Sequence, residues 1–165
     1  MNRIGKLTAL VLLGSVQAVS QANPATPGRT ENYSGMYMFL RDGEFVQITV
    51  EDEGRVTGFI SRYGDDESDR GVFLNQFFKD GKLEGTQLSF VTQVVHGVWF
   101  EFKGQVARGP GKTPQEEAYY LLEGTLTESR GQDKKVSSTT RQVVFKSFPR
   151  DKETSQSRRL VQPSG

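Results

Sequence analysis

The sequence contains no cysteine, a single histidine (His96) and a single tryptophan (Trp99). The missing thiols exclude a disulfide framework, cysteine-based catalysis and any metal site with cysteine ligands. One imidazole is too few for a histidine-rich metal site. A Ser–His–carboxylate relay would depend on His96, which lies in a predicted tight turn, and no G-x-S-x-G motif accompanies it. We therefore expect no catalytic residue, no metal and no cofactor.

An excess of charge of one sign is also lacking. The 165 residues include 21 Lys and Arg against 20 Asp and Glu, which gives a net charge of +1. Nucleic-acid binding needs a basic face that displaces counterions from the phosphates. The charge balance therefore argues against a nucleic-acid partner.

No apolar run is long enough to cross a bilayer comfortably. The longest, Leu7–Val19, follows the basic residues Arg3 and Lys6 and leads to small residues that end at Ala22. This order is typical of a secretory signal peptide, and an uncleaved membrane anchor is the alternative. We expect residues 1–22 to be removed on export, which gives a secreted or periplasmic protein without a membrane span in the mature chain.

The remaining chain divides by composition into a flexible leader (23–33), a β domain (34–148) and a disordered, basic tail (149–165). Within the β domain, apolar and polar residues alternate with a period of two, and Gly-, Asp- and Asn-rich turns interrupt the runs. Turn chemistry is clearest at Arg41–Gly43, Asp80–Gly81 and His96–Gly97. The pattern predicts eight strands, at about 34–40, 43–51, 55–63, 71–78, 86–94, 97–107, 118–128 and 136–147.

Glycines recur inside or near these strands, at Gly58, Gly85, Gly104 and Gly124. A glycine inside a strand indicates a bend or a close approach of another backbone, as in a small closed barrel. Short connections favour up-and-down order. We therefore predict an all-β fold, a single closed antiparallel up-and-down barrel of about eight strands, preceded by a signal peptide.

Three segments resemble the avidin and lipocalin group of small barrels, also called calycins: Gly35–Tyr63, Trp99–Gly109 and Tyr119–Ser129. The similarity covers Gly35–Phe148 in order and spacing, and it implies an eight-stranded barrel. The polar and tryptophan side chains with which avidins grip biotin are not matched. The lipocalin G-x-W signature is also absent, since Gly35 is followed two residues later by Tyr37.

Counting by two from Gly104 assigns the inward positions of each strand. The predicted interior holds Val46, Ile48, Val50, Val56, Ile60, Arg62, Leu88, Phe90, Thr92, Val98, Phe100, Phe102, Val106, Tyr120, Leu122, Leu126, Val143 and Phe145. An eight-stranded barrel is wide enough either to be filled by side chains or to hold one small ligand. Both possibilities remain open at this point.

Apolar residues also occupy outward positions and predict a partner interface: Phe45, Phe59, Tyr63, Trp99, Tyr119 and Leu121. Such a patch favours homo-oligomerisation through the barrel wall. The alternative is that the leader, the tail or long Lys and Arg side chains cover these residues.

Up-and-down order brings alternate connections to one barrel mouth, here 41–43, 64–70, 95–97 and 129–135. The acidic connection 64–70 offers oxygen ligands but fails the EF-hand pattern, which favours a solvated loop over a Ca²⁺ site. Arg62 is expected to pair with an anionic group of a ligand and Tyr37 to pack on its apolar body; a rim salt bridge between Arg62 and Glu44 is the alternative. The candidate ligand-binding residues are Tyr37, Glu44, Arg62, Thr92 and His96.

The first hypothesis is therefore an exported, non-enzymatic β-barrel that binds a small, partly apolar ligand at one mouth. The alternative is a structural or protein-interaction barrel with a filled core, which oligomerises through the outer aromatics. An enzyme of the dirigent or cyclase-like barrel type is the third hypothesis, and it would have only Glu44, Arg62, His96 and the acidic loop for chemistry.

Overall fold

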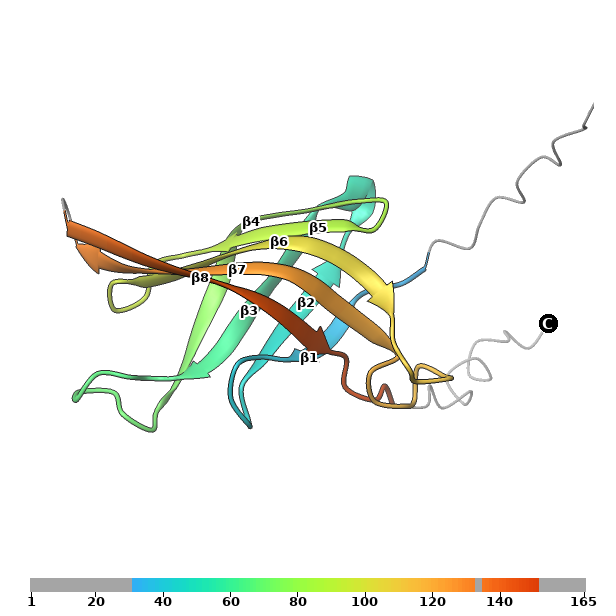
Figure 1. The fold of residues 1–165 in the computed structure, drawn as a ribbon, viewed down its shortest axis with the longest axis horizontal. Coiled ribbons are helices and arrows are strands. Elements are labelled where there is room, and N and C mark those ends of the chain that lie inside the picture. Colours follow the sequence, from blue (N-terminus) through green and yellow to red (C-terminus); the bar gives the residue numbers. More distant parts are fainter. Residues whose placement is uncertain (1–30, 133–134, 152–165) are drawn as a thin grey trace, which may run out of the picture. The chain divides into compact units, whose positions relative to one another are not determined.

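The computed structural model describes residues 31–132 and 135–151, so the predicted signal peptide, most of the leader and most of the tail lie outside the described residues. Eight strands follow one another, and each pairs antiparallel with the next (Figure 1). This confirms the predicted up-and-down order. No helix in these two ranges is long and apolar enough to cross a membrane. The strands are β1 (Gly35–Met38), β2 (Phe45–Val50), β3 (Val56–Tyr63), β4 (Phe73–Glu84), β5 (Gln87–Thr92), β6 (Val98–Arg108), β7 (Tyr120–Gln132) and β8 (Lys135–Lys146), with a 3-10 turn, η1 (Asp52–Gly54), between β2 and β3.

The inward side chains are those that period-two counting predicts. In β6, Val98, Phe100 and Phe102 are buried, while Trp99 between them lies on the outer face and is half-buried. The same alternation is clear in β2 and β5, because successive side chains of a strand point to opposite faces of the sheet. The predicted interior is thereby confirmed.

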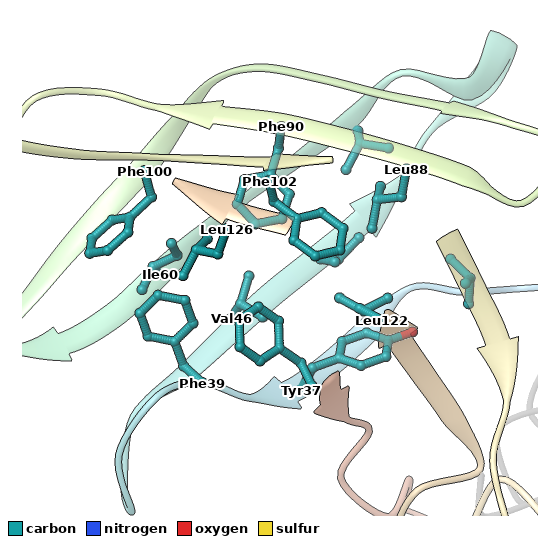
Figure 2. Close-up of a cluster of buried hydrophobic side chains, with 14 of the residues drawn as sticks. Tyr37, Phe39, Val46, Ile60, Leu88, Phe90, Phe100, Phe102, Leu122 and Leu126 are labelled. Carbon is teal, nitrogen blue, oxygen red and sulfur yellow. The ribbon is translucent and has the colours of Figure 1, made fainter. Parts of the chain in front are cut away.

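Aromatic rings fill the middle of the barrel. The Phe78 and Phe90 rings stack with their centroids 4.3 Å apart, and Phe102 lies 5.3 Å beyond Phe90. Phe145 of the last strand packs 6.0 Å from Phe102. Figure 2 shows the inward side chains of several strands converging on this cluster. Burial of these rings is the main source of stability in a chain that has no disulfide.

Two of the glycines permit a close approach of neighbouring strands. Gly104 and Gly124 are directly paired across β6 and β7. A Cβ on Gly104 would lie 2.2 Å from the carbonyl oxygen of Glu123 and 2.7 Å from the Gly124 Cα. Side chains at these positions would force the strands apart, so the pair supports the tight curl of the sheet. Gly85, in contrast, forms the turn between β4 and β5.

The predicted turn at Asp80–Gly81 is wrong, because β4 runs on to Glu84. The pairing register of β4 with β5 shifts between Phe78 and Asp80, which leaves Lys79 as a β-bulge. A bulge bends a strand without ending it. Here β4 pairs with β3 before the bend and with β5 after it, so the turn-forming residues mark a bend rather than a connection.

The two edges of the curled sheet meet at one end. Tyr37 of β1 forms a bridge with Ser147, which follows β8, and the Phe148 N–H donates to the Met36 carbonyl at 2.9 Å. Beyond them, the Arg150 side chain donates to the carbonyls of Asn32 and Ser34. The end of the barrel at which the chain enters β1 is therefore fastened by the residues that follow β8.

Candidate functional site

A pocket of about 290 Å³ opens at the other end of the barrel. Its walls combine four arginines, three carboxylates and three apolar residues. These are Arg41, Arg62, Arg130 and Arg141; Glu44, Asp65 and Glu128; and Phe39, Leu40 and Phe100. The pocket therefore offers an apolar surface framed by charged groups, with one positive charge in excess.

The connections predicted to share a mouth do meet here. Asp65, in the connection after β3, accepts hydrogen bonds from Arg41 at 3.1 Å and from Arg130 at 2.7 Å. Asp69 of the same connection contacts His96, with 2.5 Å between its Oδ2 and the imidazole Nδ1. Asp69 is buried, and its other oxygen accepts the Asp66 N–H, so this segment is an organised turn rather than a loose loop. No group of three or more metal-ligating side chains occurs among the described residues.

Arg62 is the buried cation of the site, with only 3% of its surface exposed. Its Nε donates to the Gln76 Oε1 at 3.1 Å, its Nη1 donates to the Tyr63 carbonyl, and its guanidinium lies 5.7 Å from the centre of the Phe100 ring. Burial lowers the pKa of Arg62, and the carboxylate of Asp65, 3.7 Å away, opposes this shift. A guanidinium starts from so high a pKa that it stays charged at neutral pH.

One nitrogen of this guanidinium has no hydrogen-bond partner among the described residues. Among the described residues, the Nη2 atom of Arg62 forms no hydrogen bond. In the same residues, every fully buried side-chain nitrogen and oxygen has a partner. The Nη2 atom is therefore not fully shielded from solvent, and because Arg62 lines the pocket this nitrogen is available to donate to an acceptor bound there.

Gln76 is a central site residue that the sequence analysis missed. This fully buried side chain accepts from Arg62 and donates to the Thr92 hydroxyl at 3.1 Å and to the carbonyls of Gln93 and Val98. It therefore connects the cation to two further strands, β5 and β6. Extending period-two counting through the predicted strand at 71–78 would have identified it as an inward polar residue.

Glu44 positions the pocket rim and has little capacity left for a ligand. Its carboxylate accepts from the Arg41 Nε at 2.8 Å, from the Arg41 N–H and from the Tyr63 N–H at 3.0 Å. These bonds hold the turn after β1 against the end of β3. The ion pair of Glu44 is therefore with Arg41, and Arg62 is left for the interior.

Thr92 and His96, two further candidate residues, lie in different surroundings: one is buried and the other is exposed. The Thr92 hydroxyl is buried and accepts from Gln76 and from the Phe100 N–H at 2.9 Å, so it supports the pocket floor. His96 is exposed and adopts a positive φ of 50° in a two-residue turn. It contacts Asp69 and does not line the pocket.

Tyr37 lies at the fastened end of the barrel, outside the pocket. It is fully buried, and its hydroxyl donates to the Tyr33 carbonyl at 2.7 Å. Burial raises the pKa of Tyr37, so its phenol stays protonated. The structure brings Glu44 and Arg62 together in the pocket wall, with Thr92 beneath them, but it does not bring Tyr37 there.

The outward aromatics fall into separate groups. Phe45 and Phe59 form a continuous row with Phe77, and Tyr63 packs against Phe73 at a centroid distance of 4.3 Å. Phe73 and Phe77 are about half exposed, and the sequence analysis did not include them. Tyr119 is covered by Arg108, 3.4 Å above its ring; Leu121 packs near Gly109, and Trp99 lies apart on β6.

Asp65 links three of the pocket arginines. Its partial burial would by itself raise the pKa of the carboxyl, but the hydrogen bond from Arg130 and the charges of Arg41 and Arg62 outweigh this effect. The pKa of Asp65 is therefore held below its ordinary value, and the carboxylate is ionised at neutral pH.

Comparison with solved structures identifies the architecture as an avidin-like β-barrel. The rhizavidin–biotin complex aligns with a TM-score of 0.53 and 12% identity over 73% of this chain and 97% of that chain. Rhizavidin alone gives 0.53 and 12%, over 74% and 87%. Intact afifavidin in its apo form gives 0.50 and 9%, over 74% and 85%. The predicted resemblance to avidin-type barrels is confirmed at the level of fold.

The sequence itself carries no comparable likeness. No protein-family model and no curated protein matches it. At 9–12% identity, the structural likeness defines the fold alone. Function has to be argued from the side chains of the pocket.

Proposed function

We propose that the protein is a non-enzymatic binding protein that holds a small carboxylate with a short apolar body in the pocket beside Arg62. The observation that carries this proposal is the buried guanidinium with one unpaired nitrogen available at the pocket. A buried cation is costly unless it is paired, and a ligand carboxylate would supply the missing acceptor. Rhizavidin, which shares the architecture, is known in complex with biotin.

The dimensions and lining of the pocket define the size and character of the ligand. Its volume of about 290 Å³ lies at the lower limit of ligand-binding cavities. Phe39, Leu40 and Phe100 offer a surface for an aliphatic or aromatic body. The lone tryptophan lies on the outer face, so a tryptophan-lined site is not available, and charge recognition by Arg62 takes its place.

Titration with octanoate, followed by calorimetry, tests the proposal. Octan-1-ol has the same chain length without the charge and serves as the matched ligand control. We expect octanoate to bind and octan-1-ol to bind at least about tenfold more weakly, because a charge-assisted hydrogen bond contributes about 1.5–3 kcal/mol. Arg62→Gln should weaken octanoate binding by a similar factor.

Arg55→Gln is the matched protein control, since Arg55 is exposed and pairs with Glu51 away from the pocket. Circular dichroism should show that both variants are folded. Equal binding of the acid and the alcohol, or unchanged octanoate binding by Arg62→Gln, would contradict the proposal. Failure of octanoate to bind at millimolar concentration would do the same.

A second candidate function, a protein-interaction barrel, is favoured by the outer face of β1, β2, β3 and the first half of β4. Its outward residues include no Asp, Glu, Lys or Arg. Beyond the Lys79 bulge, the outward positions of β4 become Asp80, Lys82 and Glu84. Aromatic, uncharged surfaces are typical of the centre of homodimer interfaces. We propose this face as an interface between copies of the chain.

Phe77→Lys tests this interface by placing a charge at its exposed centre. Sedimentation velocity should show a concentration-dependent oligomer for the natural protein and dissociation for the variant. Gln105→Lys is the matched control, because it adds the same charge to an exposed position of β6. An oligomer whose size is the same with and without Phe77→Lys would exclude this face as an interface.

Export is the remaining part of the proposal, and it is supported by the basic, apolar and small-residue order of residues 1–22. Protein expressed with this segment should be recovered outside the cytoplasm with Asn23 as its first residue. Intact-mass measurement checks this outcome, and retention of Met1 or Asn2 would contradict it.

A further inference from the structure

The edge of β8 that faces away from β7 is free over most of its length. β8 pairs with β7 from Lys135 to Lys146, but the contact with β1 is confined to the bridge between Ser147 and Tyr37. Within residues 31–132 and 135–151, no other segment pairs with this edge between Lys135 and Val144. In Figure 1, the end of the β7–β8 hairpin at which β8 begins projects beyond the rest of the sheet.

The hydrogen bonds at the end of β8 determine which residues direct their backbone groups to the free edge. Ser147 bonds towards β7, since its N–H donates to the Tyr120 carbonyl and its carbonyl accepts from Ala118. Phe148 bonds the other way, to Met36. Because an antiparallel strand alternates its bonding direction at every residue, the even-numbered residues of β8 direct their N–H and C=O groups away from β7.

This edge has few of the features that usually protect an edge strand. The segment Val136–Thr140 contains neither proline nor charge, and no bulge interrupts the pairing of β8 with β7. Two of its outward side chains are unusually apolar for an exposed strand: Val136 is 52% exposed and Val144 is 57% exposed. A long, regular edge with such an uncharged stretch is a template for another strand.

We infer that β8 pairs antiparallel with β8 of a second copy of this chain, about a two-fold axis at Thr140. In this register Val136 lies opposite Val144 of the partner subunit, so each exposed valine gains an apolar neighbour. Ser138 lies opposite Gln142 of the partner subunit. Every such pair joins two even-numbered residues, whose free backbone groups can then exchange hydrogen bonds.

Charge supports a second copy in this register. The basic residues of β8 are Lys135, Arg141 and Lys146. Pairing about Thr140 places Arg141 opposite Thr139 of the partner subunit, so no two like charges face each other directly between Val136 and Val144. A shift of two residues would pair Val136 with Gln142 of the partner subunit and lose the match between the valines. The symmetric spacing of the two valines about Thr140 therefore selects the register.

The test is the oligomeric state of the full-length protein, measured by sedimentation equilibrium over a range of concentrations. The measurements use the Phe77→Lys background, which removes association through the aromatic face, and in this background the protein should form a dimer. The double variant V136K/V144K should raise the dimer dissociation constant at least about tenfold, because two like-charged pairs then face each other. Both positions are exposed, so the variant should remain folded.

The charge-swapped variant V136K/V144E tests the register, since it places opposite charges at the facing positions and should restore the dimer. Gln105→Lys is the control for added charge, and Phe77→Lys separates this edge from the aromatic face. A protein that stays monomeric at all concentrations, as when its own terminal segments cover the edge, would overturn the inference. A dimer that V136K/V144K leaves intact, or that V136K/V144E fails to restore, would also overturn it.

Discussion

The two ends of the barrel interior are built by the same alternation of inward side chains, yet one is packed and the other holds a pocket. At the fastened end, Tyr37 and Tyr120 fill the space, and the Tyr33 carbonyl and Ser147 satisfy the polar groups. At the pocket end, the inward positions carry the polar side chains of Arg62 and Gln76 beside the rings of Phe39 and Phe100. A curled sheet therefore does not determine whether its interior is filled; the side chains at each end do.

Phe102→Ala should have the largest effect, because Phe102 belongs to the packed middle that both ends share. The ring is fully buried between Phe90 and Phe145. Removing it should lower the free energy of unfolding by about 3–5 kcal/mol, measured by urea denaturation. Phe77→Ala removes an exposed ring of the same size and should cost far less. Equal losses would show that the middle is not the main core.

Gln76→Ala should have the next largest effect on stability, and this effect should arise at the pocket end. It leaves the Nε of Arg62 without its partner and removes one of two donors from the Val98 carbonyl, and each buried group left unsatisfied costs about 1–3 kcal/mol. Unfolding free energy should fall by about 2–4 kcal/mol. Asn75→Ala, at the exposed neighbouring position, is the control. A loss below about 1 kcal/mol would show that water replaces the amide.

Tyr37→Phe should affect only the fastened end. It removes the hydrogen bond to the Tyr33 carbonyl and keeps the ring, so stability should fall by about 0.5–1.5 kcal/mol. Octanoate affinity should not change, because Tyr37 lies outside the pocket. Weaker octanoate binding by a fully folded variant would instead give Tyr37 the ligand role that the sequence analysis assigned to it.

The smallest effect should be the pH dependence contributed by Asp65. Its pKa is lower in the folded protein than its ordinary value of 3.8, so its contribution to stability is present above that value and is lost as the pH falls below it. The carboxylate is about one-third exposed, which keeps the contribution below about 1 kcal/mol. The stability difference between the natural protein and Asp65→Asn should therefore shrink below about pH 4. A difference that stays constant there would contradict this role.

Much of the fold follows from local patterns in the sequence. Alternating polarity identified the strands and their inward faces, because each strand buries one face and exposes the other. The prediction failed in β4, where Lys79 inserts a bulge and reverses the alternation between Phe77 and Asp80. Turn-like residues there looked like a connection, since a bend and a turn favour the same residue types.

The candidate site was predictable only in outline. Up-and-down order placed the acidic connection and His96 at one mouth, and period-two counting placed Arg62 inside the barrel. Period-two counting tells which face of the sheet a residue lies on, but not how far along the barrel it lies. Tyr37 and Arg62 were therefore assigned to one binding site, although they lie at opposite ends.

The sequence alone determined an all-β chain of eight consecutive strands with known inward faces, because these properties depend on neighbours along the chain. Only the tertiary structure decided which residues meet between strands that are distant in sequence. It paired Glu44 with Arg41, connected Arg62 to Thr92 through Gln76, and left the edge of β8 free. These outcomes depend on register, curl and the length of β1, and such long-range geometry is set by the packing of the whole sheet.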